Sequence, residues 1–333
     1  MASKKAASNA DSLNILDSLP ADQIERRLRV TIPGSTANLG PGFDALGLAL
    51  AIYTRLTFVL LKEDDRSIAR INLADGIASS LPADDSNLVY SFFSEALHHK
   101  PDLLRRARLA IDTEIPLGRG LGSSAAALLG SLYGGRAMSG SAPDNETLLS
   151  LGLRYEGHVD NISASLLGGM TICAPAGDRR KVATQRLRWP KQWRTTVVVP
   201  SYPLSTHEAR LVLPKAVPRL EAVENVQRVA LLVAAVVNED ESALVEALHD
   251  RLHEPYRNPL VPELESLRKY LKDSPILGCV LSGAGPSILV VHNERHHQRV
   301  NADLTGWAQR QHSQPTVLNL EVDNQGMTIA NDV

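Results

Sequence analysis

The sequence lacks an excess of either charge sign. Its 333 residues contain 35 Lys and Arg against 37 Asp and Glu, which gives a formal net charge of −2. It has neither a basic field that would attract nucleic acid nor a basic amphipathic stretch suited to a membrane surface. We therefore expect small-molecule partners, with no nucleic acid and no membrane among them.

Cysteine is also scarce. Cys173 and Cys279 stand far apart, outside any C-x-x-C spacing. This argues against a disulfide scaffold and a cysteine-based zinc site, fits a reducing compartment, and predicts two buried free thiols. The histidines in HNERHHQR suggest a metal site, but a strand end followed by a solvated helix start is the favoured interpretation.

Long hydrophobic runs are missing as well. The longest unbroken apolar run, VALLVAAVV at 229–237, is too short to span a bilayer and predicts a buried core helix. Residues 1–27 form a polar extension rich in Ser and Ala, as transit peptides are. Asp11, Asp17 and Asp22 count against that role. A cytoplasmic protein is expected, with organellar targeting not favoured.

The folded part alternates strand and helix patterns without a repeat period. Strands are predicted at 28–33, 45–53, 54–61, 106–115 and 195–200, and helices at 123–138, 145–155, 217–237, 241–249 and 262–272. The composition, 44% hydrophobic and 22% charged, is that of a globular protein, and the length suggests two domains. We predict an α+β fold with mixed or antiparallel sheets, divided into domains at 28–175 and 176–333.

The segment IPLGRGLGSSAAALLG at 115–130 links a predicted strand to a predicted helix through closely spaced glycines. This arrangement suits phosphate, because bare backbone lets several amides converge and the helix start adds the positive end of its dipole. Ser123 and Ser124 can cap the helix or donate to phosphate oxygens and a metal ion. A tight structural turn is the alternative interpretation.

Two better-known phosphate loops do not fit this segment. A Walker A loop requires G-x-x-x-x-G-K-[ST], and the sequence has no Gly-Lys dipeptide. A Rossmann fingerprint requires G-x-G-x-x-G, whereas Gly118, Gly120 and Gly122 are spaced G-x-G-x-G. The rest of the chain also lacks a doubly wound pattern.

Three segments in order resemble the motifs of the GHMP kinases. PLGRGLGSSAAA (116–127) is similar to their ATP-binding loop, VTIPGSTANLGPGFDALGLAL (30–50) to the first motif, and VLSGAGPSILVV (280–291) to the third. The form STANLGPGFD, with EGHVDN, STHEAR and DRLHEPYR, resembles the homoserine kinase branch. Val159 departs from the Pro usual in that family, and Gly34 from the usual Ala.

The resemblance implies an ATP-dependent, Mg²⁺-requiring kinase that makes O-phosphohomoserine in threonine biosynthesis. It implies a left-handed βαβ N-terminal domain, a ferredoxin-like C-terminal domain and a homodimer. Another small-molecule GHMP kinase, of the shikimate or mevalonate type, stays open as an alternative. So does a catalytically silent binding module.

The resemblance also places residues at the substrate. It implies a site lined by Asn38, Asp44, His158, Asp160, Arg210 and Arg257, with Asn161, Thr206 and Arg210 as catalytic residues. Guanidinium forks suit a carboxylate, and the aspartates suit an ammonium group. Taken singly, each of these residues has an ordinary structural interpretation.

For the nucleotide, the resemblance implies a binding site formed by Asn87, Pro116, Gly118, Arg119, Gly120, Leu121, Gly122, Ser123, Ser124 and Ala125. Ser124 and Glu156 are the candidate Mg²⁺ ligands. Since Asn161 stands where related kinases place an aspartate base, we predict phosphoryl transfer without a dedicated protein base.

Overall fold

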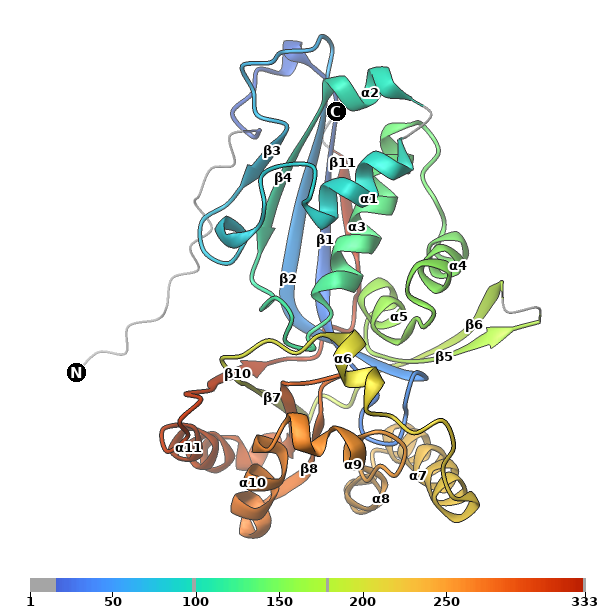
Figure 1. The fold of residues 1–333 in the computed structure, drawn as a ribbon, viewed down its shortest axis with the longest axis vertical. Helices are drawn as coiled ribbons and strands as arrows, with labels where there is room; N and C mark the ends of the chain where they lie inside the picture. The colour runs from blue at the N-terminus through green and yellow to red at the C-terminus, as the bar shows by residue number, and fades with distance from the viewer. Residues whose placement is uncertain (1–15, 98–99, 178–179, 332–333) are drawn as a thin grey trace.

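The computed structural model describes residues 16–97, 100–177 and 180–331. Figure 1 shows two halves, each built on a β-sheet, with α6 and several loops between them. Helices lie against one face of the upper sheet and beneath the lower sheet. Within the described residues no helix is long and apolar enough to cross a membrane.

The first sheet has the order β11-β1-β2-β4-β3, with β5 paired to both β2 and β6. β3 and β4 are parallel, and the other neighbours are antiparallel. Its strands are β1 (Ile24–Ala37), β2 (Leu46–Leu61), β3 (Ile71–Leu73), β4 (Ala107–Thr113), β5 (Met170–Ala176), β6 (Lys181–Leu187) and β11 (Thr328–Asn331). The helices of this half are α1 (Leu88–Ala96), α2 (Pro101–Arg106), α3 (Ser123–Met138), α4 (Asn145–Glu156) and α5 (Asp160–Leu167).

The prediction of two strands at 45–53 and 54–61 is wrong, because β2 runs through both segments. Tyr53 and Thr54 continue the ladder, pairing with Pro33 and Ile32 of β1. The irregularity lies instead on β1, as a register shift between Pro33 and Gly34. No turn-forming residue separates Tyr53 from Thr54, so the strand has no reason to end there.

The second sheet is antiparallel, in the order β10-β7-β9-β8. Its strands are β7 (Trp193–Val199), β8 (Ile276–Leu281), β9 (Ile288–Asn293) and β10 (Thr316–Leu320). The helices of this half are α6 (Thr206–Leu211), α7 (Arg219–Asn238), α8 (Glu241–Ala247), α9 (Glu254–Arg257), α10 (Glu263–Tyr270) and α11 (His297–Ala308). Helices separate β7 from β8 and β9 from β10, which is the β-α-β-β-α-β pattern of the ferredoxin-like fold.

The first sheet extends beyond residue 175, the predicted end of the first domain. β6 forms a hairpin with β5, and β11 returns from the end of the chain to pair with β1. The hairpin carries the sheet past residue 175, and β11 adds a strand from the far end of the chain. The division into 28–175 and 176–333 stays a prediction.

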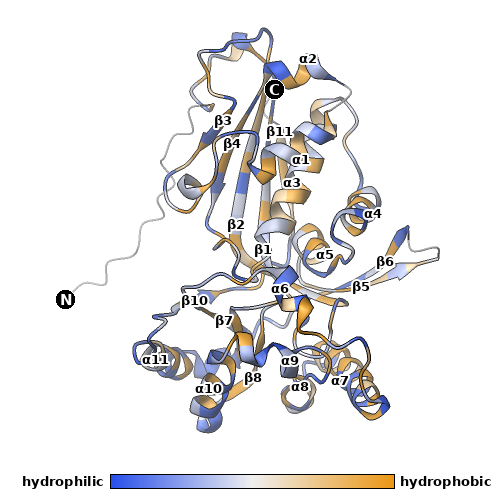
Figure 2. Ribbon diagram, viewed as in Figure 1, coloured by the Kyte–Doolittle hydropathy of each residue, from blue (hydrophilic) through white to orange (hydrophobic). Residues whose placement is uncertain are grey.

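The apolar run at 229–237 is helical, as predicted, but it is only half buried. Leu232, Ala235 and Val236 face the core, whereas Leu231 is 37% and Val237 60% exposed. Figure 2 shows hydrophobic residues along α7 at the edge of the molecule. The prediction of a buried core helix therefore holds for one side of α7 and is wrong for the other.

The two cysteines match their prediction, since Cys173 and Cys279 are both buried free thiols. His292 lies near the end of β9, as expected, but it is fully buried and its ring contacts Thr196. Among the described residues, no candidate metal group includes this histidine segment.

Candidate active site

The glycine-rich loop adopts a backbone that few other residues could follow. Gly118, Gly120 and Gly122 have φ values of +64°, +75° and +73°, in the left-handed region. A Cβ on Gly120 would lie 2.4 Å from the Ser282 carbonyl oxygen, and one on Gly122 would lie 2.2 Å from Ser35 Oγ. Conformation and space both require glycine here.

The loop leads directly into α3, which begins at Ser123. Gly122 occupies the N-cap, and no side chain of the described residues caps this helix end. The amides of the first turn therefore keep their donors for an anion, at the positive end of a helix of 16 residues. Ala125, Ala126 and Ala127 in the same turn add no bulk.

Residues from the second half of the chain hold this loop in place by donating hydrogen bonds to the loop's carbonyl groups. The Leu204 amide donates to Gly118 O at 3.1 Å, and the Ser287 amide to Arg119 O at 3.2 Å. Ser282 Oγ donates to Gly120 O at 2.6 Å. Residues far apart in sequence thus fix the backbone of the glycine-rich loop.

Beside the helix start, Ser124 Oγ donates to Glu156 Oε1 at 2.7 Å. The two predicted Mg²⁺ ligands therefore lie together, as a hydroxyl and a carboxylate. This oxygen-only pair fits Mg²⁺, which takes few protein ligands when it also binds phosphate oxygens. Asp44, His158 and Asp160 could also gather round an ion. Their carboxylates, however, are paired with Arg210 and His158.

Two arginines line the same site as the loop, and they differ in whether a carboxylate neutralises their charge. Arg210 makes a two-point ion pair with Asp44, with Nη1 to Oδ2 at 3.1 Å and Nη2 to Oδ1 at 2.6 Å. Arg257 is 1% exposed and donates to Ala209 O, Gly283 O and His253 Nδ1. It has no ion pair within the described part of the chain. Burial and then the nearby Arg210 charge lower the pKa of Arg257 to about 10.

Phe43 lies against both of these cations. The guanidinium carbons of Arg210 and Arg257 are 5.6 and 5.4 Å from its ring centroid. His253 stacks on the ring at 5.1 Å, and its Nε2 donates to Gly40 O at 2.9 Å. The electron-rich ring face stabilises two positive charges that would otherwise repel each other.

A third cluster surrounds the start of α5. Asp160 is buried, and its Oδ1 accepts from the Asn161 amide at 2.8 Å and lies 3.0 Å from His158 Nδ1. Burial lowers the pKa of His158, but the hydrogen bond and charge of Asp160 outweigh it, so the pKa is raised. Asn161 Oδ1 accepts from Ser35 Oγ at 3.0 Å.

Asn38 connects the two sides of the pocket. It has φ +72°, and its Nδ2 donates to Gly283 O at 2.8 Å while its Oδ1 accepts from the Asp44 amide at 3.0 Å. These bonds explain its left-handed backbone, which asparagine tolerates better than most residues. Asn38 thereby holds Asp44 and Gly283 in position.

These groups line one cavity of about 360 Å³. The predicted residues that line it are Asn38, Asp44, Gly118, Gly120, Gly122, Ser123, Ser124, Ala125, Glu156, His158, Asp160, Asn161, Thr206, Arg210 and Arg257. They come from both halves of the molecule, around α6 in Figure 1.

Four predicted nucleotide-binding residues do not line this cavity. Asn87 is 1% exposed and caps α1 by accepting from the Val89 and Tyr90 amides. Leu121 is buried in the core, and Arg119 donates to Ser201 O at 2.6 Å. Pro116 precedes the loop. Their contact with nucleotide stays a prediction.

Sequence reasoning missed three residues that shape this site: Phe43, His253 and Ser35. His253 and Arg257 are four residues apart, which places them on one face of a helical turn. That spacing could have identified the pair. Phe43 and Ser35 carry no such signal, because their roles depend on contacts distant in sequence.

Comparison with known proteins agrees with this geometry. Residues 87–169 match the family model of the GHMP kinases N terminal domain, and residues 232–305 that of the GHMP kinases C terminal domain. A homoserine kinase of Nostoc punctiforme is 34% identical over 90% of this chain and 97% of its own length. One of Deinococcus radiodurans is 39% identical over 81% of this chain and 86% of its own length.

A solved structure shows the same similarity in three dimensions. The crystal structure of homoserine kinase from Cytophaga hutchinsonii superimposes with a TM-score of 0.77 at 25% identity. The match covers 91% of this chain and 97% of that one. The chain therefore belongs to the homoserine kinase family, within the GHMP kinases.

Proposed function

We propose that this protein transfers the γ-phosphoryl group of ATP to the terminal hydroxyl of L-homoserine, giving O-phospho-L-homoserine and ADP. The observation that carries the proposal is Arg257, a buried guanidinium without a carboxylate partner among the described residues, facing the same cavity as the glycine-rich loop. A buried, unpaired cation indicates an anionic ligand. The product's expected use is threonine biosynthesis.

The substrate's charges complement this end of the cavity. Its carboxylate would bind Arg257 and Arg210, and its ammonium group would bind Asp44, with Asp160 nearby. Arg210 and Asp44 are already paired, so a zwitterion can engage both without leaving a net charge behind. An uncharged sugar could not make this exchange, whereas shikimate and mevalonate lack the ammonium group.

The phosphates would lie on the loop and the start of α3. Mg²⁺, held by Ser124 and Glu156, would supply charge neutralisation at the phosphate oxygens. The free amides of the first helical turn would hold the transferred group in line with the substrate hydroxyl. Thr206, at the start of α6, lies within the same cavity.

We propose that no protein group removes the hydroxyl proton, which passes to the phosphate or to solvent. Asn161 lines the cavity but cannot accept a proton at neutral pH. Asn161→Asp is therefore expected to lower turnover. A severalfold increase, with a new carboxylate titration in the pH–rate profile, would contradict this mechanism.

A substrate panel tests the function directly. ADP release is measured with ATP, Mg²⁺ and either L-homoserine, shikimate, mevalonate or galactose. We expect turnover with homoserine alone, together with phosphorus NMR evidence of a phosphate monoester. Preference for another acceptor, or no turnover with any of them, would overturn the proposal.

We also propose a homodimer that covers the exposed side of α7. Leu220, Val223, Val226 and Val237 are 69%, 44%, 70% and 60% exposed. Burying apolar surface of this kind favours association with a second copy. Val226→Glu should give a monomer in analytical ultracentrifugation, whereas Val226→Ala should remain dimeric. A monomeric parent protein would contradict the proposal.

A further inference from the structure

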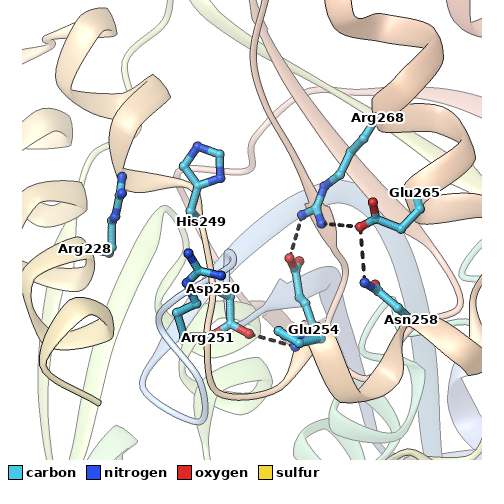
Figure 3. A pocket seen from close by; sticks show the side chains of 9 residues that line it. Arg228, His249, Asp250, Arg251, Glu254, Asn258, Glu265 and Arg268 are labelled. Carbon is cyan, nitrogen blue, oxygen red and sulfur yellow. Dashed lines mark hydrogen bonds and ion pairs between the residues drawn. The ribbon is translucent and has the colours of Figure 1, made fainter. Parts of the chain in front are cut away.

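A second cavity, of about 510 Å³, lies beside the substrate pocket. Figure 3 shows Arg228 from α7 on one side, Arg268 and Glu265 from α10 on the other, and His249 and Arg251 between them. Asp250 and Glu254 also face this cavity, whereas Arg257, on the same short segment, faces the substrate pocket. The function proposed above makes no use of the second cavity.

On the cationic side of this cavity, several hydrogen-bond donors have no acceptor among the described residues. Among the residues that the structure describes, the Arg228 side chain bonds only through Nη1, to the carbonyl and carboxylate of Glu246. Within the same residues, the Arg251 side chain bonds only through Nε, to Glu224 at 3.1 Å. The His249 ring has no hydrogen-bond partner in the part of the chain that the structure describes. Most of both guanidinium forks and one imidazole are therefore available to a ligand.

The acidic side, by contrast, is already occupied. Glu254 accepts from the Leu281 amide at 2.7 Å and from Arg268 Nη2 at 2.5 Å. Glu265 is bonded to Arg268 and Asn258, each at 3.2 Å. Only Asn258 Oδ1 is a buried acceptor that lacks a partner among the described residues lining this cavity. The unused groups are thus donors for an oxyanion and one acceptor for a hydroxyl or amino group.

The charged residues around the second cavity produce a positive potential at His249. Partial burial, followed by the charges of Arg228 and Arg268, lowers the pKa of His249. Glu246 and Glu254 act in the opposite direction but do not cancel this effect. These four charged groups come from α7, α8, α9 and α10, the elements around the histidine. A bound anion would raise this pKa.

Hydrogen bonds connect the second cavity to the substrate pocket. Asp250 accepts from the amides of His253 and Glu254, both at 2.7 Å, and so fixes the start of α9. Glu254 holds the Leu281 amide, just before the turn in which Gly283 O accepts from Arg257. Any ligand that moves Arg251 or His249 therefore acts on the segment that positions Arg257.

We propose that this second cavity binds the oxyanion group of a small molecule, a phosphate or a carboxylate, through Arg228, Arg251 and His249, and that its occupancy changes the affinity of the substrate pocket. Binding is independent of the proposed function, whereas the coupling rests on it. Inorganic phosphate and succinate, each compared with chloride at equal ionic strength, separate the two oxyanion sources.

The His249 imidazole is titrated by NMR in the full chain with each probe. A bound anion should raise its pKa by about one unit. The double variant Arg228→Gln/Arg251→Gln should abolish the shift, and Arg219→Gln, an exposed change on the same helix, should retain it. A shift with phosphate alone or with succinate alone identifies the oxyanion. No shift with either, or an equal shift in the double variant, overturns the site.

The coupling is tested by the KM for homoserine with and without the effective probe. We expect a change of about fivefold or more that the double variant lacks. Phosphate competing at the glycine-rich loop would affect both proteins equally and so is distinguished. An unchanged KM beside a shifted His249 pKa overturns the coupling. If the double variant does not fold, Arg251→Gln alone carries both tests, since it removes one exposed ion pair.

Discussion

The two ends of the active-site cavity provide positive potential in different ways. At the proposed phosphate end the donors are main-chain amides around Gly122 and Ser123, with no cation in the first turn of α3. At the proposed substrate end they are the side chains of Arg210 and Arg257, held against Phe43. One end depends on backbone shape, and the other on buried charge.

This difference determines which substitutions each end should tolerate. A backbone site is insensitive to the chemistry of its outward side chains but cannot accept a Cβ where the chain approaches itself. A side-chain site tolerates small changes of shape but depends on the geometry of each charged group. The following experiments test this contrast.

The largest effect is expected from Gly120→Ala. The new Cβ would lie 2.4 Å from Ser282 O and 2.7 Å from Gly285 O, so the loop must move. A displacement of about 1 Å at a reacting group costs roughly a hundredfold in rate. We expect at least that loss in kcat/KM for ATP, measured by steady-state kinetics.

Gly76→Ala is the matched control. Gly76 also has a left-handed φ, +83°, but a Cβ there meets nothing within 4 Å. This variant carries the conformational strain without the collision, about 1–2 kcal/mol. If it loses activity as severely as Gly120→Ala, close approach is not what makes the loop glycine necessary.

The next effect is expected from Arg257→Lys at the substrate end. A lysine keeps the charge but cannot reproduce the three contacts to Ala209 O, Gly283 O and His253. Loss of charged hydrogen bonds, about 1.5–3 kcal/mol, corresponds to a rise in the KM for homoserine of roughly 10- to 150-fold. The KM for ATP should stay within about twofold of the parent value if the two ends act separately.

Arg55→Lys provides the comparison for that variant. Arg55 is a half-buried surface residue paired with Asp112 and Glu114. Surface ion pairs contribute about 1 kcal/mol or less, so both KM values should be unchanged. Equal losses in the two variants would show that Arg257 acts through general stability rather than through ligand binding.

The same contrast explains what the sequence could predict. Gly118, Gly120, Gly122 and the serines after them form a local signal, and α3 begins at Ser123 as that signal indicates. The arginine end has no local signal of comparable strength. Arg210 and Asp44 were predicted as separate ligands, yet they form an ion pair across 166 positions of sequence.

Errors in the fold have similar causes. The apolar run in α7 has no polar residues to mark its exposed side, so its periodicity could not show that Val237 faces outward. The strand β11 pairs with β1 across almost the whole chain, a contact that local pattern does not encode. Segment type follows from neighbouring residues, whereas partners follow from topology.

A smaller effect is expected from Phe43→Leu, which removes the ring that both guanidiniums lie over. Cation–π contacts contribute about 0.5–2 kcal/mol, so the KM for homoserine should rise by roughly 2- to 30-fold with little change in kcat. Phe43→Tyr keeps the ring and should restore the parent KM. If leucine and tyrosine behave alike, volume rather than the aromatic face positions the arginines.

The smallest effect concerns His158 and Asp160, where charge at the substrate end depends on pH. The pKa of His158 is raised above its ordinary value of 6.5 by the hydrogen bond and charge of Asp160, against the effect of burial. The charged pair therefore stabilises the fold fully below pH 6.5, and this contribution is lost as pH rises through the raised pKa. In Asp160→Asn the carboxylate is gone, and burial, followed by the Arg210 charge, lowers the pKa of His158. The Tm of the parent protein should exceed that of the variant by more at pH 6 than at pH 9, and this change in the Tm difference should be no more than about 2 °C. Thermal unfolding of both proteins at the two pH values measures it. If the Tm difference between the parent protein and the variant instead widens as pH rises, His158 is neutral in the folded protein and Asp160 acts only through the Asn161 amide.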